Sequence, residues 1–262
     1  MFVRDRNISD CVIIASEMIN LLTKKQFGGN IAIKVDIRKT FDTLDWKFLL
    51  AVLHQFGFNN LFCDWILTIL RSAHLSILVN GNVVGFFPCA RGVRQRGPLS
   101  PLLFCLAEEV LSRTLEIERC SNVLQHMSYC QGVSLPTHIL YANDVFICCV
   151  GSRKNIICLL KVFAAYAEVS GQLVNFDKSK LFTGAMTIAR KNMLAQLSGF
   201  TLGTTPFHYL GCPIFQGKPK CIHFQQTVDR IKVKLATWKG ILLFIVGRIQ
   251  LVKSIVNPLG LA

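Results

Sequence analysis

The feature that most constrains this chain is the short run Tyr141-Ala142-Asn143-Asp144, which lies between two apolar stretches within residues 138–149. A short polar turn between β-branched and aromatic runs is typical of a tight β-hairpin. Such a hairpin keeps its flanking strands buried and exposes its turn residues. The pattern therefore predicts a hairpin that presents a carboxylate, Asp144, at its tip.

A second strand that ends on an acid lies in the N-terminal part of the chain. The apolar run from Ile31 ends at Asp36, and Asp42 follows six residues later. Carboxylates from two such strands can share Mg²⁺ ions that lie about 3.5–4 Å apart in phosphoryl-transfer sites. Asp42 is too far along the chain to share this point with Asp36, so we expect it to cap or brace the next helix. The pattern predicts a two-metal site built on Asp36 and the hairpin tip.

Composition limits the class of protein. The chain has 262 residues, 52% of them apolar, and a mean hydropathy of +0.43. No run reaches the roughly 18 uncharged apolar residues of a membrane span, and residues 1–6 lack the apolar core of a signal peptide. The 11 cysteines show no C-x-x-C pair and no zinc-type spacing, which is typical of reduced intracellular proteins. We therefore expect an intracellular protein, cytoplasmic or nuclear, with no membrane partner.

Positive charge is concentrated in the C-terminal part. Residues 1–150 carry a net charge of +2 and residues 151–262 a net charge of +12, within a total of +14. Such a basic segment attracts a polyanion, because each neutralised phosphate releases counterions. A solvated basic face has the same composition, so charge alone leaves both interpretations open.

Periodicity and capping signals predict helices interleaved with short strands. We expect Ser9-Asp10, Asp45 and Asn59 or Asn60 to cap the first three helices. Asn80-Gly81 predicts a type I′ hairpin turn. The expected helices are 11–22, 46–55, 60–69, 102–118, 154–170, 188–197 and 223–239. Their alternation with strands predicts an α+β fold without internal repeats.

Taken together, the motifs resemble those of the reverse transcriptases of LINE-type (non-LTR) retrotransposons, as found in plants. The resembling segments, in chain order, are 2–10, 34–42, 91–101, 141–144, 171–180, 209–213 and 238–248. In that family the hairpin reads Phe/Tyr-Ala-Asp-Asp, so Asn143 stands where an aspartate is expected. The chain departs from the family pattern also at Asp5, Thr40 and Arg96-Gly97.

The resemblance implies a polymerase right hand of the α+β class. Its palm is a small antiparallel sheet covered by helices, with partial fingers and a truncated helical thumb. The implied boundaries are 1–30 for the partial fingers, 31–215 for the palm with inserted fingers elements, and 216–262 for the partial thumb. The endonuclease and C-terminal modules of a parent polyprotein fall outside the resemblance, so we expect a fragment or a decayed copy.

The resemblance also implies a catalytic centre. Asp36, Asn143 and Asp144 would form it, with Asp36 and Asp144 as ligands of two Mg²⁺ ions. Lys178 is implied near the triphosphate, where it would protonate the pyrophosphate leaving group. A solvated turn lysine is the competing interpretation of Lys178.

Further residues are implied at the substrates. Arg6, Phe41 and Gln95 would contact the nucleotide, and the bulk of Phe41 would exclude a ribose 2′-OH. A core aromatic is the competing interpretation of Phe41. The implied primer and template contacts are Tyr209, Gly211, Lys234 and Lys239. A basic surface facing the primer–template duplex would comprise Lys218, Lys220, Arg230, Lys232, Lys234 and Lys239.

The implied reaction is attack of a DNA primer 3′-OH on the α-phosphate of a deoxynucleoside triphosphate, directed by an RNA template. Asn143 removes one negative charge from the metal site, so we expect the activity to be impaired. One alternative is a catalytically dead, nucleic-acid-binding remnant of a retroelement. Another is a translated relic with no function. Primer extension separates the enzyme from the binder, and salt-dependent RNA binding separates the binder from the relic.

Overall fold

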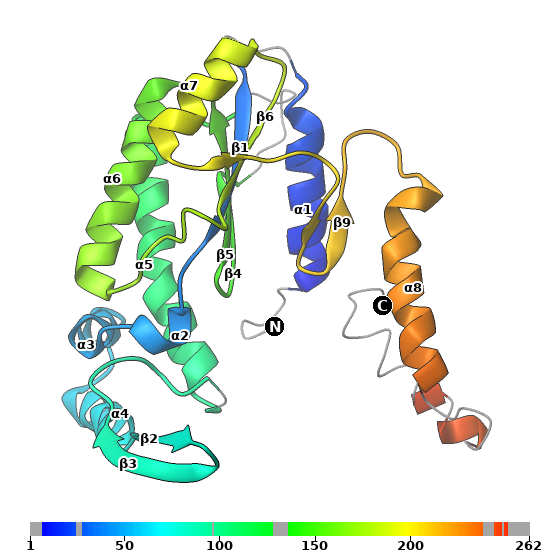
Figure 1. The fold of residues 1–262 in the computed structure, drawn as a ribbon. Helices are drawn as coiled ribbons and strands as arrows, with labels where there is room; N and C mark the ends of the chain where they lie inside the picture. Colours follow the sequence, from blue (N-terminus) through cyan, green and yellow to red (C-terminus); the bar gives the residue numbers. More distant parts are fainter. Residues whose placement is uncertain are drawn as a thin grey trace.

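The computed structural model describes residues 7–24, 28–95, 97–127, 136–237, 244–247 and 249–250. Its centre is a five-stranded sheet in the order β4-β5-β1-β6-β7 (Figure 1). The strands are β1 (Asn30–Asp36), β4 (His138–Tyr141), β5 (Asp144–Val150), β6 (Lys180–Thr183) and β7 (Thr201–Leu202). All neighbouring pairs are antiparallel except β6 and β7. The strand that ends on Asp36 is therefore the central one.

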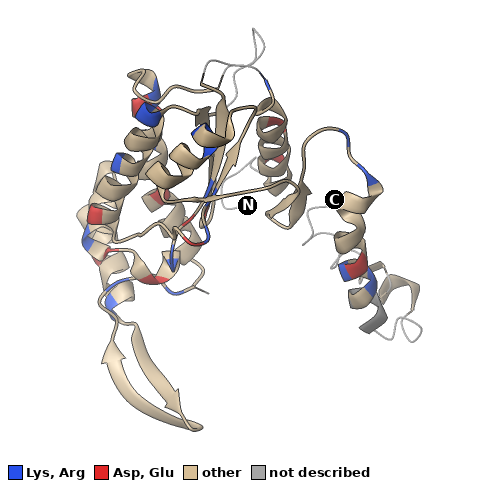
Figure 2. Cartoon of the chain, turned by 45° about the horizontal axis from the view of Figure 1, so that its top comes forward, with Lys and Arg blue, Asp and Glu red and all other residues tan. Residues whose placement is uncertain are grey.

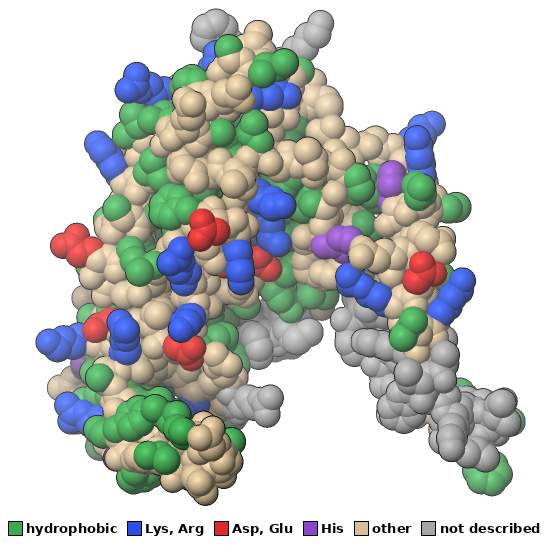
Figure 3. Space-filling view, viewed as in Figure 1, with side chains coloured by type: hydrophobic (Ala, Val, Ile, Leu, Met, Phe, Trp, Pro, Cys, Tyr) green, Lys and Arg blue, Asp and Glu red, His purple; other side chains and the backbone are tan. Residues whose placement is uncertain are grey.

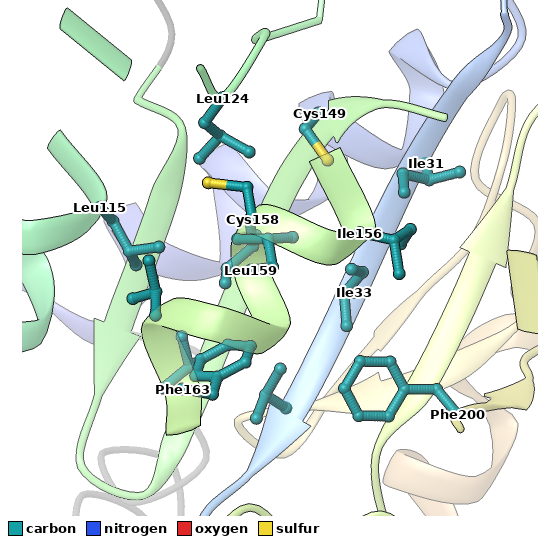
Figure 4. Close-up of a cluster of buried hydrophobic side chains, with 14 of the residues drawn as sticks. Ile31, Ile33, Leu115, Leu124, Cys149, Ile156, Cys158, Leu159, Phe163 and Phe200 are labelled. Carbon is teal, nitrogen blue, oxygen red and sulfur yellow. The ribbon is translucent and has the colours of Figure 1, made fainter. Parts of the chain in front are cut away.

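Three helices cover one face of this sheet. They are α5 (Ser100–Cys120), α6 (Arg153–Ser170) and α7 (Ile188–Ser198). Alternate residues of β1 point toward them, and Figure 4 shows Ile156 of α6 beside Ile31 and Ile33. Full burial of such a side chain contributes about 1.5–3 kcal/mol. This layer fixes which face of β1 is turned away from the helices.

The other face carries α1 (Ile8–Leu21) and the hairpin of β8 (Phe207–Tyr209) and β9 (Cys212–Ile214). Met18 of α1 packs with Phe146 and Tyr209 in one buried cluster. Because side chains alternate along a strand, Asp36 belongs to this face of β1. The helix α8 (Cys221–Thr237) follows β9 and lies on the same side of the sheet (Figure 1).

The N-terminus of α1 differs from the prediction. The residue at the N-cap is Asn7, not Ser9-Asp10, and Asp10 completes a capping box by accepting the Asn7 N–H at 3.2 Å. Asp10 is thus an N3 residue, a position that acids also favour. In addition, α1 packs on the sheet. The domain boundaries at residues 30 and 215 stay a prediction.

A separate cluster lies at the end of the sheet where β1 finishes. It contains α2 (Thr40–Thr43), α3 (Trp46–Gln55), α4 (Asn60–Arg71) and the hairpin of β2 (His74–Val79) and β3 (Asn82–Pro88). The predicted caps Asp45 and Asn59 are confirmed. Asn80 and Gly81 both have positive φ, as predicted for this turn. Figure 3 shows apolar side chains on the surface of the β2–β3 hairpin.

The helix predictions agree with the structure to within two residues at each described end, except that α1 begins three residues before its predicted start. Gly171 ends α6 with a φ of 74°. In the described ranges, no helix is both long and apolar enough to cross a membrane. In those ranges, no disulfide bond joins the cysteines.

Candidate active site

Asp36 and Asp144 lie directly opposite each other at the end of the β1–β5 ladder. Directly opposite residues of an antiparallel pair project on the same face of a sheet. The β4–β5 turn that precedes Asp144 is tight, with Ala142 at a φ of 50°. The carbonyl of Asn143 accepts the N–H of Ile37 at 3.2 Å, which ties the turn to the end of β1. The predicted convergence of Asp36, Asn143 and Asp144 is thus confirmed.

Two amides hold the carboxylate of Asp36. Asn143 Nδ2 donates to Oδ1 at 3.3 Å, and Asn175 Nδ2 donates to Oδ2 at 3.1 Å. The backbone carbonyl of Asp36 accepts the Asn175 N–H at 2.8 Å. The backbone N–H of Asp36 donates to Ser179 Oγ at 3.1 Å. Both carboxylate oxygens therefore have fixed partners. Asn175 and Ser179 are site residues that the sequence analysis missed, although both lie in the segment quoted for Lys178.

Asp144 has a cationic partner. Lys34 Nζ lies 3.4 Å from Asp144 Oδ1 and also donates to the His208 carbonyl at 3.5 Å. Burial raises the pKa of Asp144, the Lys34 ammonium opposes that rise, and the charge of Asp36 adds to it. Lys34 thus lowers the negative charge of the site. The sequence pattern did not predict a role for Lys34, because its contact with Asp144 depends on the pairing of strands.

A pocket of about 430 Å³ adjoins Asp36. It brings together Phe41, Gln95 and Lys178, three residues that the sequence analysis placed at the nucleotide. Phe41 packs on Phe104 with ring centroids 5.0 Å apart, so its position is fixed by core packing. The remaining lining residues are Ile37, Arg38, Lys39, Thr40, Asn143 and Asn175. The volume is within the range of small-molecule sites.

Asp42 lies beside this pocket in a role that differs from the prediction. The cap of the following helix is Asp45, whose Oδ1 accepts the Phe48 N–H at 2.9 Å. Asp42 instead accepts a hydrogen bond from Gln95 Nε2 at 3.2 Å. It therefore positions Gln95 and does not cap a helix.

The structure describes only some of the residues predicted to contact the primer and the nucleotide. Tyr209 is completely buried, in contact with Phe146 at 5.4 Å between ring centroids, and its hydroxyl has no hydrogen-bond partner in the described ranges. Its ring lies under the Lys34 ammonium group, with Nζ 5.8 Å from the ring centroid. A primer contact by Tyr209 stays a prediction. Gly211 lies in the β8–β9 turn with a φ of 84° and open space around it. Arg6, Lys239 and the side chain of Lys234 lie outside the described residues.

The basic residues of the C-terminal part are partly described. Arg230 and Lys232 are on α8, and Lys218 and Lys220 precede it. Figure 2 shows basic residues in blue on α8 and on the segment that leads to it. Asp229 is an acidic neighbour on the same helix. That these groups form one duplex-facing surface stays a prediction.

The donors at the strand ends fit one divalent cation better than two. Asp36 and Asp144 supply two carboxylates, and the Asn143 amide supplies a neutral oxygen that Mg²⁺ also accepts. Within the ranges that the structure describes, no cluster of three or more His, Cys, Asp or Glu residues could hold a metal ion. Lys34 further reduces the negative charge. The residues therefore fit a single cation between Asp36 and Asp144. They lack one of the negative charges that two Mg²⁺ ions would need.

A small sheet with two facing acids at its strand ends, helices on both faces and an acid-tipped hairpin is the arrangement of a polymerase palm. Residues 2–214 match the family described as "Reverse transcriptase (RNA-dependent DNA polymerase)". This chain belongs to that family.

Its curated relatives are proteins of non-LTR retrotransposons. It is 25% identical over 209 residues to the Pol polyprotein of a type-1 retrotransposable element R2 from Popillia japonica, covering 76% of this chain and 33% of that protein. It is 24% identical over 244 residues to the transposon TX1 149 kDa protein of Xenopus laevis, covering 91% and 18%. The chain thus spans a third or less of these relatives. Their organisms do not support the plant subgroup.

Solved structures show the same fold. Telomerase from Candida albicans, in complex with a TWJ fragment of telomeric RNA, has a TM-score of 0.54 at 13% identity, covering 97% of this chain and 42% of that one. Apo telomerase from Candida tropicalis, truncated from its C-terminal domain, has a TM-score of 0.50 at 14% identity, covering 70% and 36%. At these identities the likeness concerns the fold alone. It confirms the predicted polymerase architecture.

Proposed function

We propose that this chain is an RNA-directed DNA polymerase domain whose nucleotidyl transfer is impaired by Asn143. The observation that carries the proposal is the pairing of Asp36 with Asp144 in the β1–β5 ladder, with the Asn143 amide 3.3 Å from Asp36. Two carboxylates on one face of a sheet support a metal-dependent transferase. The Asn143 amide stands in place of a third carboxylate, which supports a transferase of low activity.

The chain's own residues have distinct roles in this proposal. The pocket beside Asp36 receives the deoxynucleoside triphosphate, with Phe41 at the sugar and Gln95 held by Asp42. Lys178 lines the same pocket and would protonate the leaving pyrophosphate. The primer 3′-OH would approach from the face of the sheet that carries β8 and β9.

Divalent metal use is general in this family, and here Asp36 and Asp144 would hold Mg²⁺. When bound, Mg²⁺ neutralises charge that develops on the transferred phosphate. The Asn143 amide donates toward Asp36, so its oxygen would have to rotate inward before it could serve as a ligand. The loss of one carboxylate from a site for two dications would lower the rate by orders of magnitude.

The substrates follow from the same family. We propose an RNA template, a DNA primer and deoxynucleoside triphosphates, supported by the retrotransposon relatives and by the telomerase solved with an RNA fragment. The cysteines, which form no disulfide bond in the described ranges, and the basic C-terminal part support a reducing, nucleic-acid-containing compartment, the cytoplasm or the nucleus.

The second candidate function is nucleic-acid binding without catalysis. The observation that favours it is the pairing of both acids with the chain's own groups, Asp144 with Lys34 and Asp36 with two amides. A chain that keeps its fold and basic surface but holds no metal would still bind an RNA–DNA duplex. Its affinity would fall steeply as salt rises.

Mg²⁺-dependent primer extension on an RNA template tests the proposal. We expect slow extension by the natural chain and extension faster by orders of magnitude by Asn143→Asp. The matched control is Asn192→Asp, which makes the same change at an exposed position of α7. Equal rates for the natural chain and Asn143→Asp would refute the impairment. No extension by either, with salt-sensitive duplex binding, would establish the binding function instead.

A further inference from the structure

A second pocket is lined by residues of α1, α5 and β4. Its volume is about 460 Å³, which is typical of ligand sites. Ile14, Ile139 and Leu140 contribute apolar walls. Acidic groups enter from both helices, Asp10 from α1 and Glu108 and Glu109 from α5. The site is therefore an apolar chamber with carboxyl groups on opposing walls.

Glu108 is the unusual member of this pocket. The residue is 4% exposed, and its Oε1 has no hydrogen-bond partner in the part of the chain that the structure describes. Burial raises the pKa of Glu108 well above its usual range. An unpaired buried carboxylate is very unfavourable, so the group stays neutral until a cation reaches it. A buried carboxyl with a free oxygen lining a cavity points to a ligand that donates hydrogen bonds.

The other titratable groups of the pocket leave it acidic. In the described ranges, no lysine or arginine lines it, although the Glu109 carboxylate is paired with Arg113 Nε on the same helix at 3.1 Å. Burial lowers the pKa of His138, whose ring nitrogens lie 2.9 Å from Ser112 Oγ and 3.0 Å from Thr137 Oγ1, so the imidazole is neutral near pH 7. The titratable side chains that face the pocket are Asp10, Cys11, Cys105, Glu108, Glu109, His138 and Tyr141. Because the whole chain has a net charge of +14, this is a local acidic site on a protein that otherwise repels cations.

The arrangement suits an organic cation better than a metal ion. Within the described residues, no cluster of three or more acidic, His or Cys side chains is close enough to hold a metal. The pocket carboxyls therefore do not converge on one point. A flexible aliphatic chain with ammonium groups can reach separate carboxyls while its methylenes contact Ile14, Ile139 and Leu140. We propose that this pocket binds an aliphatic polyamine, with one ammonium group on Glu108 and another on Asp10 or Glu109.

Binding then changes the protonation of Glu108. The neutral carboxyl of Glu108 releases its proton to the buffer. The ammonium group of the ligand, which is already charged, then pairs with the carboxylate. Only the ionised form pairs with the ligand, so affinity rises with pH until the raised pKa is reached. The affinity increases by at most about tenfold per pH unit. At pH values below the lowered pKa of His138, the imidazole becomes positively charged and would repel the ligand. This repulsion also makes the affinity lower at low pH.

The test is calorimetric titration of the chain with spermidine between pH 6.5 and 8.5, in two buffers of different ionisation enthalpy. We expect one site, proton release that approaches one per ligand at the lower pH, and stronger binding at higher pH. Glu108→Gln should weaken binding by about tenfold or more and abolish the proton release. Glu168→Gln, the same change at an exposed position of α6, should alter neither. Mg²⁺ at equal concentration should not displace spermidine.

Infrared spectroscopy of the natural chain keeps the test independent of variant folding. The carbonyl band of a protonated carboxylic acid should disappear when spermidine is added. Absence of that band, its persistence on binding, or equal spermidine affinity in Glu108→Gln would overturn the proposal. Displacement by Mg²⁺ would also overturn it, since it would show a simple cation site.

Discussion

Replacing Asn143 with aspartate should destabilise the metal-free chain and make its stability depend on Mg²⁺. The Asn143 amide donates to Asp36 at 3.3 Å, so the variant places two carboxylates at about that distance. Two unit charges 3.3 Å apart repel by about 5 kcal/mol at an effective dielectric of 20. Partial exposure and proton uptake reduce the net effect to about 2–3 kcal/mol.

For a chain of this size, that loss corresponds to a decrease in Tm of about 4–12 °C. The assay is thermal unfolding at pH 7.5 and low salt, with and without Mg²⁺. Asn143→Ala removes the hydrogen bond without adding charge and should lose about 1 kcal/mol. Mg²⁺ should raise the Tm of Asn143→Asp more than that of the natural chain or of Asn143→Ala.

The pH dependence follows from the sign of the repulsion. Like-charge repulsion raises the folded-state pKa of the carboxyl pair, so the penalty is present at pH values above that pKa and disappears as the pair binds a proton at lower pH. The Tm difference between Asn143→Asp and the natural chain should therefore narrow as the pH falls toward 4. An unchanged Tm at pH 7.5, or a Mg²⁺ response equal to that of Asn143→Ala, would refute the reasoning.

Three further variants test the surroundings of the site. Asn175→Ala removes a hydrogen bond to a charged oxygen of Asp36 and should lower the free energy of unfolding by about 1.5–3 kcal/mol, measured by urea unfolding. Lys34→Met removes the partner of Asp144 and raises the pKa of that carboxyl further, so a loss of about 1 kcal/mol at pH 8 should diminish toward pH 4. Gly171→Ala combines a positive φ with a Cβ 2.6 Å from the backbone oxygen of Thr43 and should lose more than about 2 kcal/mol.

Each variant has a matched control. Asn192→Ala changes the same residue type on the exposed side of α7 and should not lower stability. Lys191→Met tests the loss of a lysine that has no carboxylate partner in the salt bridges of the described ranges. Gly57→Ala has a φ of 87° but open space, so it isolates the conformational cost of about 1 kcal/mol. Equal losses in a variant and its control would contradict the contact assigned to that variant.

The central part of the site was predictable from the sequence because it follows from local pattern. An apolar run that ends on Asp36 and a hairpin around Asn143 each specify a strand end, and the family resemblance places the two strands together. The predicted caps Asp45 and Asn59 hold for the same reason, since capping depends only on neighbouring residues.

Contacts across elements were not predictable in this way. The pairing of Lys34 with Asp144 depends on strand order, and the hold of Asn175 on Asp36 depends on how a loop returns to the sheet. Tyr209 lies in a strand of three residues, too short for alternation to tell a buried face from an exposed one. In the described residues Glu108 Oε1 has no hydrogen-bond partner. This depends on how neighbouring elements pack, so the periodicity of the helix does not predict it.

The register of β1 against β5 decides which genetic changes this site can survive. Asp36 faces Asp144 because every residue from Asn30 to Asp36 is matched one to one with its partner in β5. A substitution at the hairpin tip, for example at position 143, alters the chemistry of the site and leaves the ladder in place. Loss or gain of a single codon within either strand would turn one acid to the opposite side of the sheet and bury it among the helices. Copies of such an element should therefore accumulate point substitutions at the tip long before they tolerate insertions or deletions in the two strands behind it.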